Sequence, residues 1–273
     1  MRALQADGWS RLTHVARAWP TIQQIAFSGM VAYRAEMIIW VLSATLPLVM
    51  LSLWNSAASG GPVGGYDQVD FARYFAVNLI VRQLTGSWIV WELNWNIRKG
   101  ELSPRLLRPM HPLVFNLCET LAALPFRAGI LFPLVGALAA WRPELLFMPS
   151  GEALAAFSLS LLLSFVLAWL IQAIFGMLAF WFDQSMGFWS AWFALWSLAA
   201  GYFVPLDLFP EGWVDFFRCL PFYATLGAPI DILLGRSAVG ANLAFQAGWT
   251  LVAGGLATAM WRAGIRRYGA VGA

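Results

Sequence analysis

Charge is what this sequence has least of. Only 11% of its 273 residues are charged, whereas 60% are hydrophobic, and the mean hydropathy is +0.67. A soluble domain usually carries about 25% charged residues. The sixteen tryptophans and twenty phenylalanines point the same way, because aromatic rings concentrate at membrane interfaces. The composition therefore excludes an ordinary soluble globule and indicates that lipid solvates much of the chain.

Groups used for catalysis and metal binding are also scarce. The two cysteines, Cys118 and Cys219, cannot build a disulfide framework, and we expect both to be packing residues. His14 and His111 are the only histidines and lie outside the apolar runs, so a Ser–His hydrolase or a His-ligated metalloprotease is unsupported. Lys99 is the only lysine and no GxxxxGK[ST] loop occurs. We expect no cofactor, no metal and no catalysis on this chain by itself.

Long apolar runs dominate the rest of the chain. A helix needs about 20 apolar residues to cross the hydrocarbon core of a bilayer. The runs are continuous rather than alternating, which favours helices over strands. They predict an all-α polytopic membrane protein in which residues 1–273 form a single transmembrane domain. The six predicted spans are residues 37–54, 74–91, 113–139, 153–182, 184–206 and 237–261.

The basic residues indicate the orientation, because cytoplasmic loops carry an excess of lysine and arginine. With a cytoplasmic amino terminus, most of the basic residues fall on the inner side: Arg2, Arg11, Arg17, Arg34, Arg98, Lys99, Arg105, Arg108, Arg262, Arg266 and Arg267. The outer side then collects the acids Asp67, Asp70, Glu144, Glu152, Asp207, Glu211, Asp215 and Asp231. We predict a bacterial inner-membrane protein with both termini cytoplasmic.

Three segments outside the spans differ from ordinary loops. Residues 20–36 place apolar side chains at helical spacing between basic flanks, which predicts an amphipathic helix on the inner surface. Residues 207–236 are too apolar for a solvated loop and too rich in proline for a span, so we expect short or re-entrant outer helices. Residues 98–112 combine basic residues with prolines on the cytoplasmic side.

Three charged residues lie inside the predicted spans and Glu92 directly follows the second span; burial there costs several kcal/mol unless the group is paired or hydrated. Arg82 and Arg127 are at similar distances from segment 98–112, and so are Glu92 and Glu119, which predicts two pairs at matched depths. One interpretation is that these groups line a substrate pathway. The other is that they pair between helices or extend toward the headgroups.

Two groups of tryptophans have helical spacing and are further candidates for the pathway. They are Trp88, Trp91 and Trp95, which flank Glu92, and Trp189, Trp192 and Trp196. Indoles beside a carboxylate suit an organic cation, through cation–π contact and charge pairing. An interfacial aromatic belt gives the same spacing.

Four motifs carry a resemblance to a known family. They are YRAEMIIW at 33–40, IRKGELSPRLLRPMHP at 97–112, FVPLDLFPEGW at 203–213 and LPFYATLGAPIDILLG at 220–235. With them the chain resembles, over nearly its whole length, the permease subunits of ABC-2 type (type V) ATP-binding-cassette exporters. Within that class it is most similar to bacterial permeases related to daunorubicin- and viologen-type multidrug exporters.

The resemblance implies an interfacial helix, six spans and short outer helices between spans five and six. It also implies that segment 98–112 is the coupling element that docks on an ATPase subunit. The residues concerned are Arg98, Lys99, Gly100, Glu101, Arg105, Leu106, Leu107, Arg108 and Pro109. ATP and Mg²⁺ would then be held by two copies of a partner ATPase. A second, homologous permease or another copy of this chain would complete the membrane unit. A simpler interpretation is that the segment only anchors the topology.

The expected function is export of a hydrophobic or organic-cation compound, with lipid export as a close alternative. An ATP-independent secondary transporter or channel would also use intramembrane arginine and glutamate. A membrane scaffold without a substrate is a third possibility. No nucleic acid partner is expected.

Overall fold

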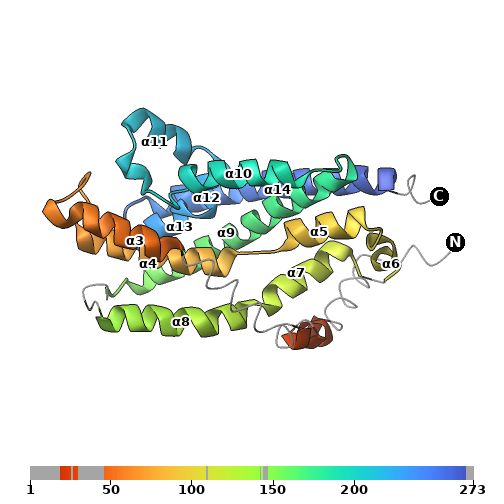
Figure 1. The fold of residues 1–273 in the computed structure, drawn as a ribbon, viewed down its shortest axis with the longest axis horizontal. Helices are drawn as coiled ribbons and strands as arrows, with labels where there is room; N and C mark the ends of the chain where they lie inside the picture. The colour runs from red at the N-terminus through yellow and green to blue at the C-terminus, as the bar shows by residue number, and fades with distance from the viewer. Residues whose placement is uncertain are drawn as a thin grey trace.

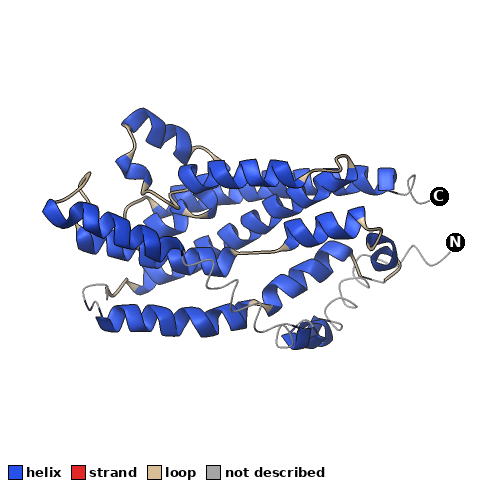
Figure 2. Ribbon diagram, in the orientation of Figure 1, coloured by secondary structure: helices blue, strands red, loops and turns tan. Residues whose placement is uncertain are grey.

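The computed structural model describes residues 19–25, 27–29, 46–108, 110–141, 143 and 147–268. Over these residues the chain is helical and has no strand beyond an isolated bridge between Val63 and Tyr66 (Figure 2). The predicted all-α fold is therefore confirmed. The helices form an elongated bundle whose longer members run roughly along one axis (Figure 1).

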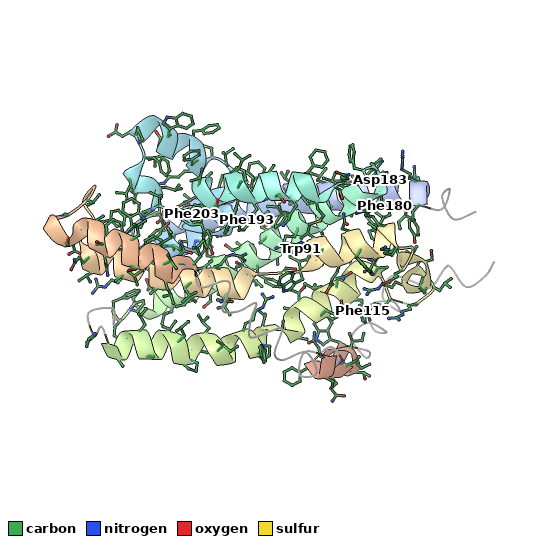
Figure 3. All side chains as sticks on the ribbon, viewed as in Figure 1. Trp91, Phe115, Phe180, Asp183, Phe193 and Phe203 are labelled. Atoms are coloured by element: carbon green, nitrogen blue, oxygen red, sulfur yellow. The ribbon has the colours of Figure 1, made fainter. Side chains whose placement is uncertain are left out.

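The two ends of the bundle hold different segments of the chain (Figure 1), and these segments differ in charge. One end holds α6 (Leu102–Leu106), the turn after η3 (Leu178–Phe180) and the carboxyl end of α14 (Val239–Tyr268). We call it the basic end, because it carries the arginines of segments 98–108 and 262–267. The opposite, acidic end holds the α3–α4 connection, the start of α9 and α11, with most of the acids predicted to face outward. Figure 3 labels Phe180 and Asp183 near the basic end, and Trp91 between the two ends.

Three helical segments are long and apolar enough to cross a membrane. They are Pro112–Ala140, Gly151–Phe180 and Val239–Tyr268. The first consists of α7 (Pro112–Ala122) and α8 (Leu124–Trp141), which join at Ala123, and the second of α9 (Gly151–Met177) and η3. Ser150 caps α9 and His111 caps α7, each by accepting a hydrogen bond from a backbone N–H of the first turn.

The predicted second span, 74–91, is not one helix. The structure divides it into α4 (Gln68–Thr85), which starts at a capping box formed by Asp67 and Asp70, and α5 (Ile89–Arg98). The backbone is extended at Gly86, with φ −65° and ψ 142°. Hydropathy missed the break because the residues at the break carry no charge. The structure therefore corrects the prediction of one continuous helix over residues 74–91.

The predicted fifth span, 184–206, contains a shorter helix, α10 (Met186–Ala199). The chain leaves the helix at Gly201, whose φ of +85° favours glycine. The Gly201 carbonyl then accepts hydrogen bonds from Tyr74 Oη at 2.7 Å and Asn78 Nδ2 at 3.1 Å. These bonds hold the carboxyl side of α10 against α4.

The outer segment 207–236 forms the short helices that were predicted. They are η4 (Leu206–Leu208), α11 (Glu211–Arg218), α12 (Pro221–Thr225) and α13 (Gly227–Leu233). Asp207 accepts a hydrogen bond from Tyr66 and forms an ion pair with Arg218, both at 2.7 Å. Tyr223 donates to Asp231 at 2.8 Å. This network makes the segment a folded cap on the acidic end.

Two apolar cores occupy the two ends. At the acidic end, α3 (Leu46–Ala57) and α4 pack with α13 and the residues after α10, around Phe71, Phe75 and Ile230. At the basic end, α5, α6, α9 and α14 pack around Leu93 and Met177. The central helix α9 runs between the two and contacts α14, α5, α13 and α4.

Parts of the amino-terminal predictions lie outside the described residues. These are residues 1–18, residue 26, and residues 30–45, which include half of span one; Pro109, Arg142 and Glu144 also lie outside. Within the predicted interfacial helix, residues 19–25 and 27–29 are helical. Gln23 Nε2 donates to the Cys118 carbonyl at 3.1 Å, which places this segment beside α7.

Candidate functional site

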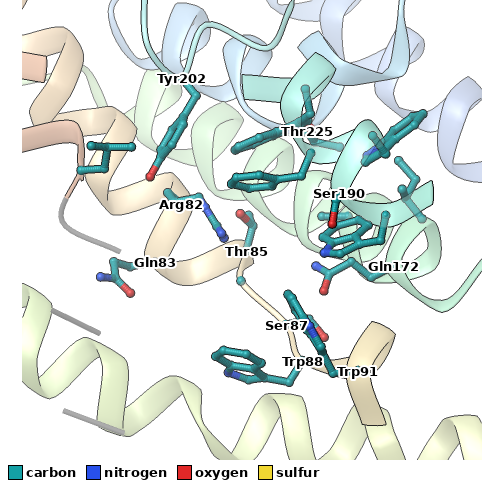
Figure 4. Close-up of a pocket in the computed structure, with 18 of the residues that line it drawn as sticks. Arg82, Gln83, Thr85, Ser87, Trp88, Trp91, Gln172, Ser190, Tyr202 and Thr225 are labelled. Atoms are coloured by element: carbon teal, nitrogen blue, oxygen red, sulfur yellow. Dashed lines mark hydrogen bonds between the residues drawn. The ribbon is translucent and has the colours of Figure 1, made fainter. Parts of the chain in front are cut away.

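A cavity of about 810 Å³ lies at the break between α4 and α5, midway along the bundle (Figure 4). Residues of α4, α5, α8, α9, α10 and the segments around Tyr202 and Thr225 surround it. Seven of its lining residues were predicted from the sequence to lie on a pathway: Arg82, Trp88, Trp91, Arg127, Trp189, Trp192 and Trp196.

Aromatic rings form one wall of the cavity. Trp91 on α5 meets Trp189 on α10 edge to face, with ring centroids 5.9 Å apart, and Trp88 lies 4.9 Å from Trp91. The Trp196 indole donates to Thr225 Oγ1 at 2.8 Å, and its ring lies 5.2 Å from that of Tyr202. All members of the two tryptophan groups except Trp95 therefore face a common space, which their separate spacings did not show.

Arg127 supports the helix break. Its side chain is 7% exposed, and Nη1 donates to the carbonyls of Gln83, at 3.4 Å, and Gly86. These groups lie at the carboxyl end of α4, where a cation is favoured by the helix dipole. A side chain at position 86 would crowd this arrangement, because its Cβ would lie 2.8 Å from Arg127 Nη1 and 3.3 Å from Arg82 Nη1.

Arg82 is the second cation of the cavity and points toward Tyr202 and Thr85 (Figure 4). Its Cζ lies 5.6 Å from the centroid of the Trp196 ring, and its buried Nε has no hydrogen-bond partner among the described residues. Within that part of the chain, no carboxylate lies within 4.0 Å of Arg82 or Arg127. The matched depth expected for these two arginines agrees with their placement around one cavity.

Neutral polar residues complete the lining, and the sequence analysis missed them. They are Gln83, Thr85, Ser87, Gln172, Ser190 and Thr225. Gln172 is 7% exposed, and its Oε1 has no partner among the described residues. The available signal was an isolated amide, which carries neither a charge nor an aromatic ring, in the largely apolar run 153–182.

The two acidic candidates, Glu92 and Glu119, lie outside this cavity. Asn116 on α7 donates to Glu92 at 2.7 Å and to Glu119 at 3.5 Å, so one amide lies between two carboxylates. The guanidinium groups of Arg105 and Arg108 attract the Glu119 carboxylate of this cluster. This geometry agrees with the interpretation that the two glutamates pair between helices, here between α5 and α7.

The expected single face of three indoles beside Glu92 is not observed. Trp88 and Trp91 line the main cavity, whereas Trp91, Glu92 and Trp95 border a second hollow of about 450 Å³ toward the basic end. Trp95 Nε1 donates to Glu101 at 3.3 Å, and Lys99 Nζ lies 5.1 Å from its ring centroid. Trp88 precedes the first residue of α5 and has a non-helical backbone, so it does not share a helical face with Trp91 and Trp95.

Segment 98–108 forms a compact turn at the basic end. Gly100, with φ +77°, reverses the chain between α5 and α6. Leu102 is fully buried in the basic-end core, whereas Leu106 is 39% and Leu107 is 89% exposed.

Its arginines lie over a ring of α7. The Cζ atoms of Arg105 and Arg108 lie 5.5 and 5.6 Å from the Phe115 centroid. Ser103 and Tyr268 of α14 share a hydrogen bond of 3.1 Å. The segment thus presents exposed leucines and guanidinium groups on a support fixed from three helices.

The structure shows no group of three His, Cys, Asp or Glu side chains that could hold a metal ion within its described residues. His111 accepts a backbone hydrogen bond from Leu113 through Nδ1 and lies 4.8 Å from the Trp261 ring. Burial lowers the pKa of His111. Its role here is to cap a helix.

Comparison with known protein families places this chain beside a family of transporters. The family model described as "ABC-2 family transporter protein" matches residues 39–272. No curated protein and no solved structure matches the chain.

Proposed function

Because this chain belongs to the ABC-2 family of transporter proteins, we propose that it is the permease subunit of an ATP-binding-cassette exporter. A separate ATPase would supply the energy, holding ATP and Mg²⁺ on its own chain. The cavity at the helix break is the proposed substrate site. The substrate would be a hydrophobic or amphiphilic compound taken from the cytoplasm or the inner leaflet.

The observation that carries the proposal is the position of α5. Its amino end supplies Trp88 and Trp91 to the cavity, and its carboxyl end leads through Gly100 into α6. Leu102 of α6 packs with Ile89, Leu93 and Ile97 of α5 in the basic-end core. Because packed cores move as units rather than deform continuously, displacement of α6 would move the wall of the cavity.

Segment 98–112 is the proposed ATPase-docking surface. Leu107 is almost fully exposed at the tip of α6, and the guanidinium groups of Arg105 and Arg108 flank it. Exposed leucine with arginine is a combination that suits an acidic, partly apolar groove on a partner. ATP-driven closure of two ATPase copies would then shift the membrane unit between inward- and outward-open states.

The orientation and the assembly belong to the same proposal. We place the basic end in the cytoplasm of a bacterial inner-membrane protein, since positive loops stay inside. A second permease, either homologous or another copy, would complete the membrane unit of the exporter.

The test exchanges one charge on the docking surface. Arg108→Glu should leave the protein inserted and its cavity intact, but lower substrate-stimulated ATP hydrolysis of the reconstituted complex by about tenfold or more, because like charges across an interface cost several kcal/mol. Arg266→Glu is the matched control, an exposed arginine at the same end but on α14. Full ATP-driven export by the Arg108 variant would contradict the docking assignment.

A secondary transporter is the second candidate, and the Glu92–Asn116–Glu119 cluster favours it. Two carboxylates that share one amide are a plausible proton site near the basic end. The two candidates separate in energised vesicles: an ATPase inhibitor stops export by an ATP-binding-cassette exporter, whereas a protonophore stops proton-coupled export.

A further inference from the structure

We infer that the cavity at the helix break selects an anionic amphiphile, with an oxyanion headgroup such as phosphate, sulfate or carboxylate and an apolar body. The inference rests on the proposed function, because it takes this cavity as the substrate site. It replaces the organic cation that was expected from the sequence.

The charge of the lining is the first argument. Both charged residues that line the cavity are arginines, and its other described lining residues are neutral. Glu92, the expected partner of an organic cation, accepts a hydrogen bond from Asn116 and borders the second hollow rather than this cavity. A cation in the cavity would face two guanidinium groups, whereas an anion would be attracted by both.

Arg82 is the group available to a headgroup. Arg127 already donates to the Gln83 and Gly86 carbonyls, so much of its hydrogen-bonding capacity serves the end of α4. Arg82 Cζ instead lies 5.6 Å from the Trp196 ring centroid, and although its side chain shares a hydrogen bond with Tyr202, its buried Nε has no partner among the described residues. Guanidinium groups match oxyanions in shape, and charge-assisted hydrogen bonds of this kind are strong.

Other polar groups around the break fit the same headgroup. Ser190 adds a hydroxyl to the lining (Figure 4), whereas the atom of the buried Gln172 amide without a partner among the described residues is Oε1, which accepts hydrogen bonds and gives an anion no contact. The first turn of α5 also opens at the break, and the amino end of a helix favours negative charge. A headgroup here would meet both charged and neutral donors.

The aromatic wall accounts for the body of the ligand. Five of the sixteen tryptophans line the cavity, together with Phe193 and Tyr202. The volume of about 810 Å³ exceeds what a free phosphate or acetate ion needs and matches a drug-sized or lipid-sized molecule. The combination of a cationic site and an apolar wall therefore indicates an amphiphile rather than a small ion.

The test measures binding to the purified full chain in nanodiscs of zwitterionic lipid. The probes are bromododecyl phosphate, bromododecanol and bromododecyl-trimethylammonium, which share one chain and differ in headgroup charge. Their bromine atoms quench the cavity tryptophans, so quenching reports occupancy. Inorganic phosphate serves as competitor, to separate binding of the amphiphile from binding of the free anion.

The expected result is tightest binding of the phosphate probe. Arg82→Gln should weaken that probe by about tenfold, the loss of one charge-assisted contact, and leave the alcohol probe unchanged. Arg82→Lys should keep most of the affinity. Arg266→Gln is the matched control, since Arg266 of α14 is exposed at the basic end and does not line the cavity.

Three results would overturn the inference: tightest binding of the trimethylammonium probe, phosphate-probe binding unaffected by Arg82→Gln, or displacement of that probe by inorganic phosphate at equal concentration. The measurement involves no ATPase. Its failure would leave the exporter assignment standing, and uncoupling by Arg108→Glu tests that assignment independently.

Discussion

At the scale of single residues, buried polar groups separate into those that shape the site and those that hold the fold. Arg127 supports the end of α4, and Arg82 is left facing the cavity. Asp231 belongs to the second kind. It lies at 5% exposure in the cap of the acidic end, where it accepts a hydrogen bond from Tyr223.

The Asp231 carboxyl predicts a pH-dependent stability. Burial raises its pKa from 3.8 to about 6, although the Tyr223 hydrogen bond and the cations Arg218 and Arg236 oppose the rise and Asp207 adds to it. The folded state therefore holds this proton more tightly than the unfolded state. Stability is fully present below pH 4 and declines as the pH rises toward 6, by on the order of 3 kcal/mol.

The measurement is the thermal unfolding of the purified chain in detergent between pH 4 and pH 7. Asp231→Asn should flatten the decline, because the variant has no proton to lose at this position. Asp215→Asn, a change to an exposed carboxyl on α11, should keep it. Equal pH profiles for the wild type and Asp231→Asn would show that another group is responsible.

At the scale of helices, the central question is how α9 holds its neighbours. Gln246 of α14 is fully buried, and its Nε2 donates to Ser164 Oγ at 2.9 Å and to the Ala224 carbonyl at 2.8 Å. Its Oε1 accepts from Ser160 Oγ at 2.8 Å. One amide thus joins α14, α9 and α12, where apolar packing alone would give no specific register.

Gln246→Leu should therefore destabilise the bundle by about 1–3 kcal/mol, since it leaves the buried Ser160 and Ser164 hydroxyls with fewer partners. The measurement is denaturant-induced unfolding in mixed micelles. Ser158→Ala on α9 is the control. The Ser158 hydroxyl is exposed, and among the described residues it donates only to the carbonyl of Leu154 in its own helix. A Gln246 variant as stable as this control would contradict the clamp.

At the scale of the whole molecule, the chain crosses between the two ends repeatedly and places acidic segments at one end and basic segments at the other. The α3–α4 connection and the start of α9 lie at the acidic end, whereas the α9–α10 turn and the end of α14 lie at the basic end (Figure 1). The cavity lies between two separate apolar cores. Such an arrangement allows one end to move relative to the other about the break in the α4–α5 segment.

The proposed orientation predicts which thiols can be reached from outside the cell. Cys219 is exposed near the acidic end and Cys118 is buried. A membrane-impermeant maleimide should label the wild-type chain in intact cells, and Cys219→Ser should abolish the labelling. A cysteine introduced by Ser103→Cys in the Cys219→Ser background should react only after permeabilisation. Labelling of this thiol in intact cells would reverse the orientation.

The sequence by itself determined the class of fold and the character of the two ends. Hydropathy and the positions of arginine are properties of each segment alone, so they predict membrane helices, the short outer helices in 207–236 and the basic segment 98–108 without knowledge of packing. They also singled out Arg82, Arg127 and the tryptophans, because such residues are conspicuous in apolar runs.

Only the tertiary structure decided what these residues do together. The break at Gly86 depends on Arg127, which lies 41 positions away in the chain and caps α4. The direction of Glu92 depends on Asn116 of another helix, and the common cavity of Trp91 and Trp189 depends on how α5 and α10 are rotated. Helix rotation and distant capping arise from contacts between segments, and no single segment encodes them.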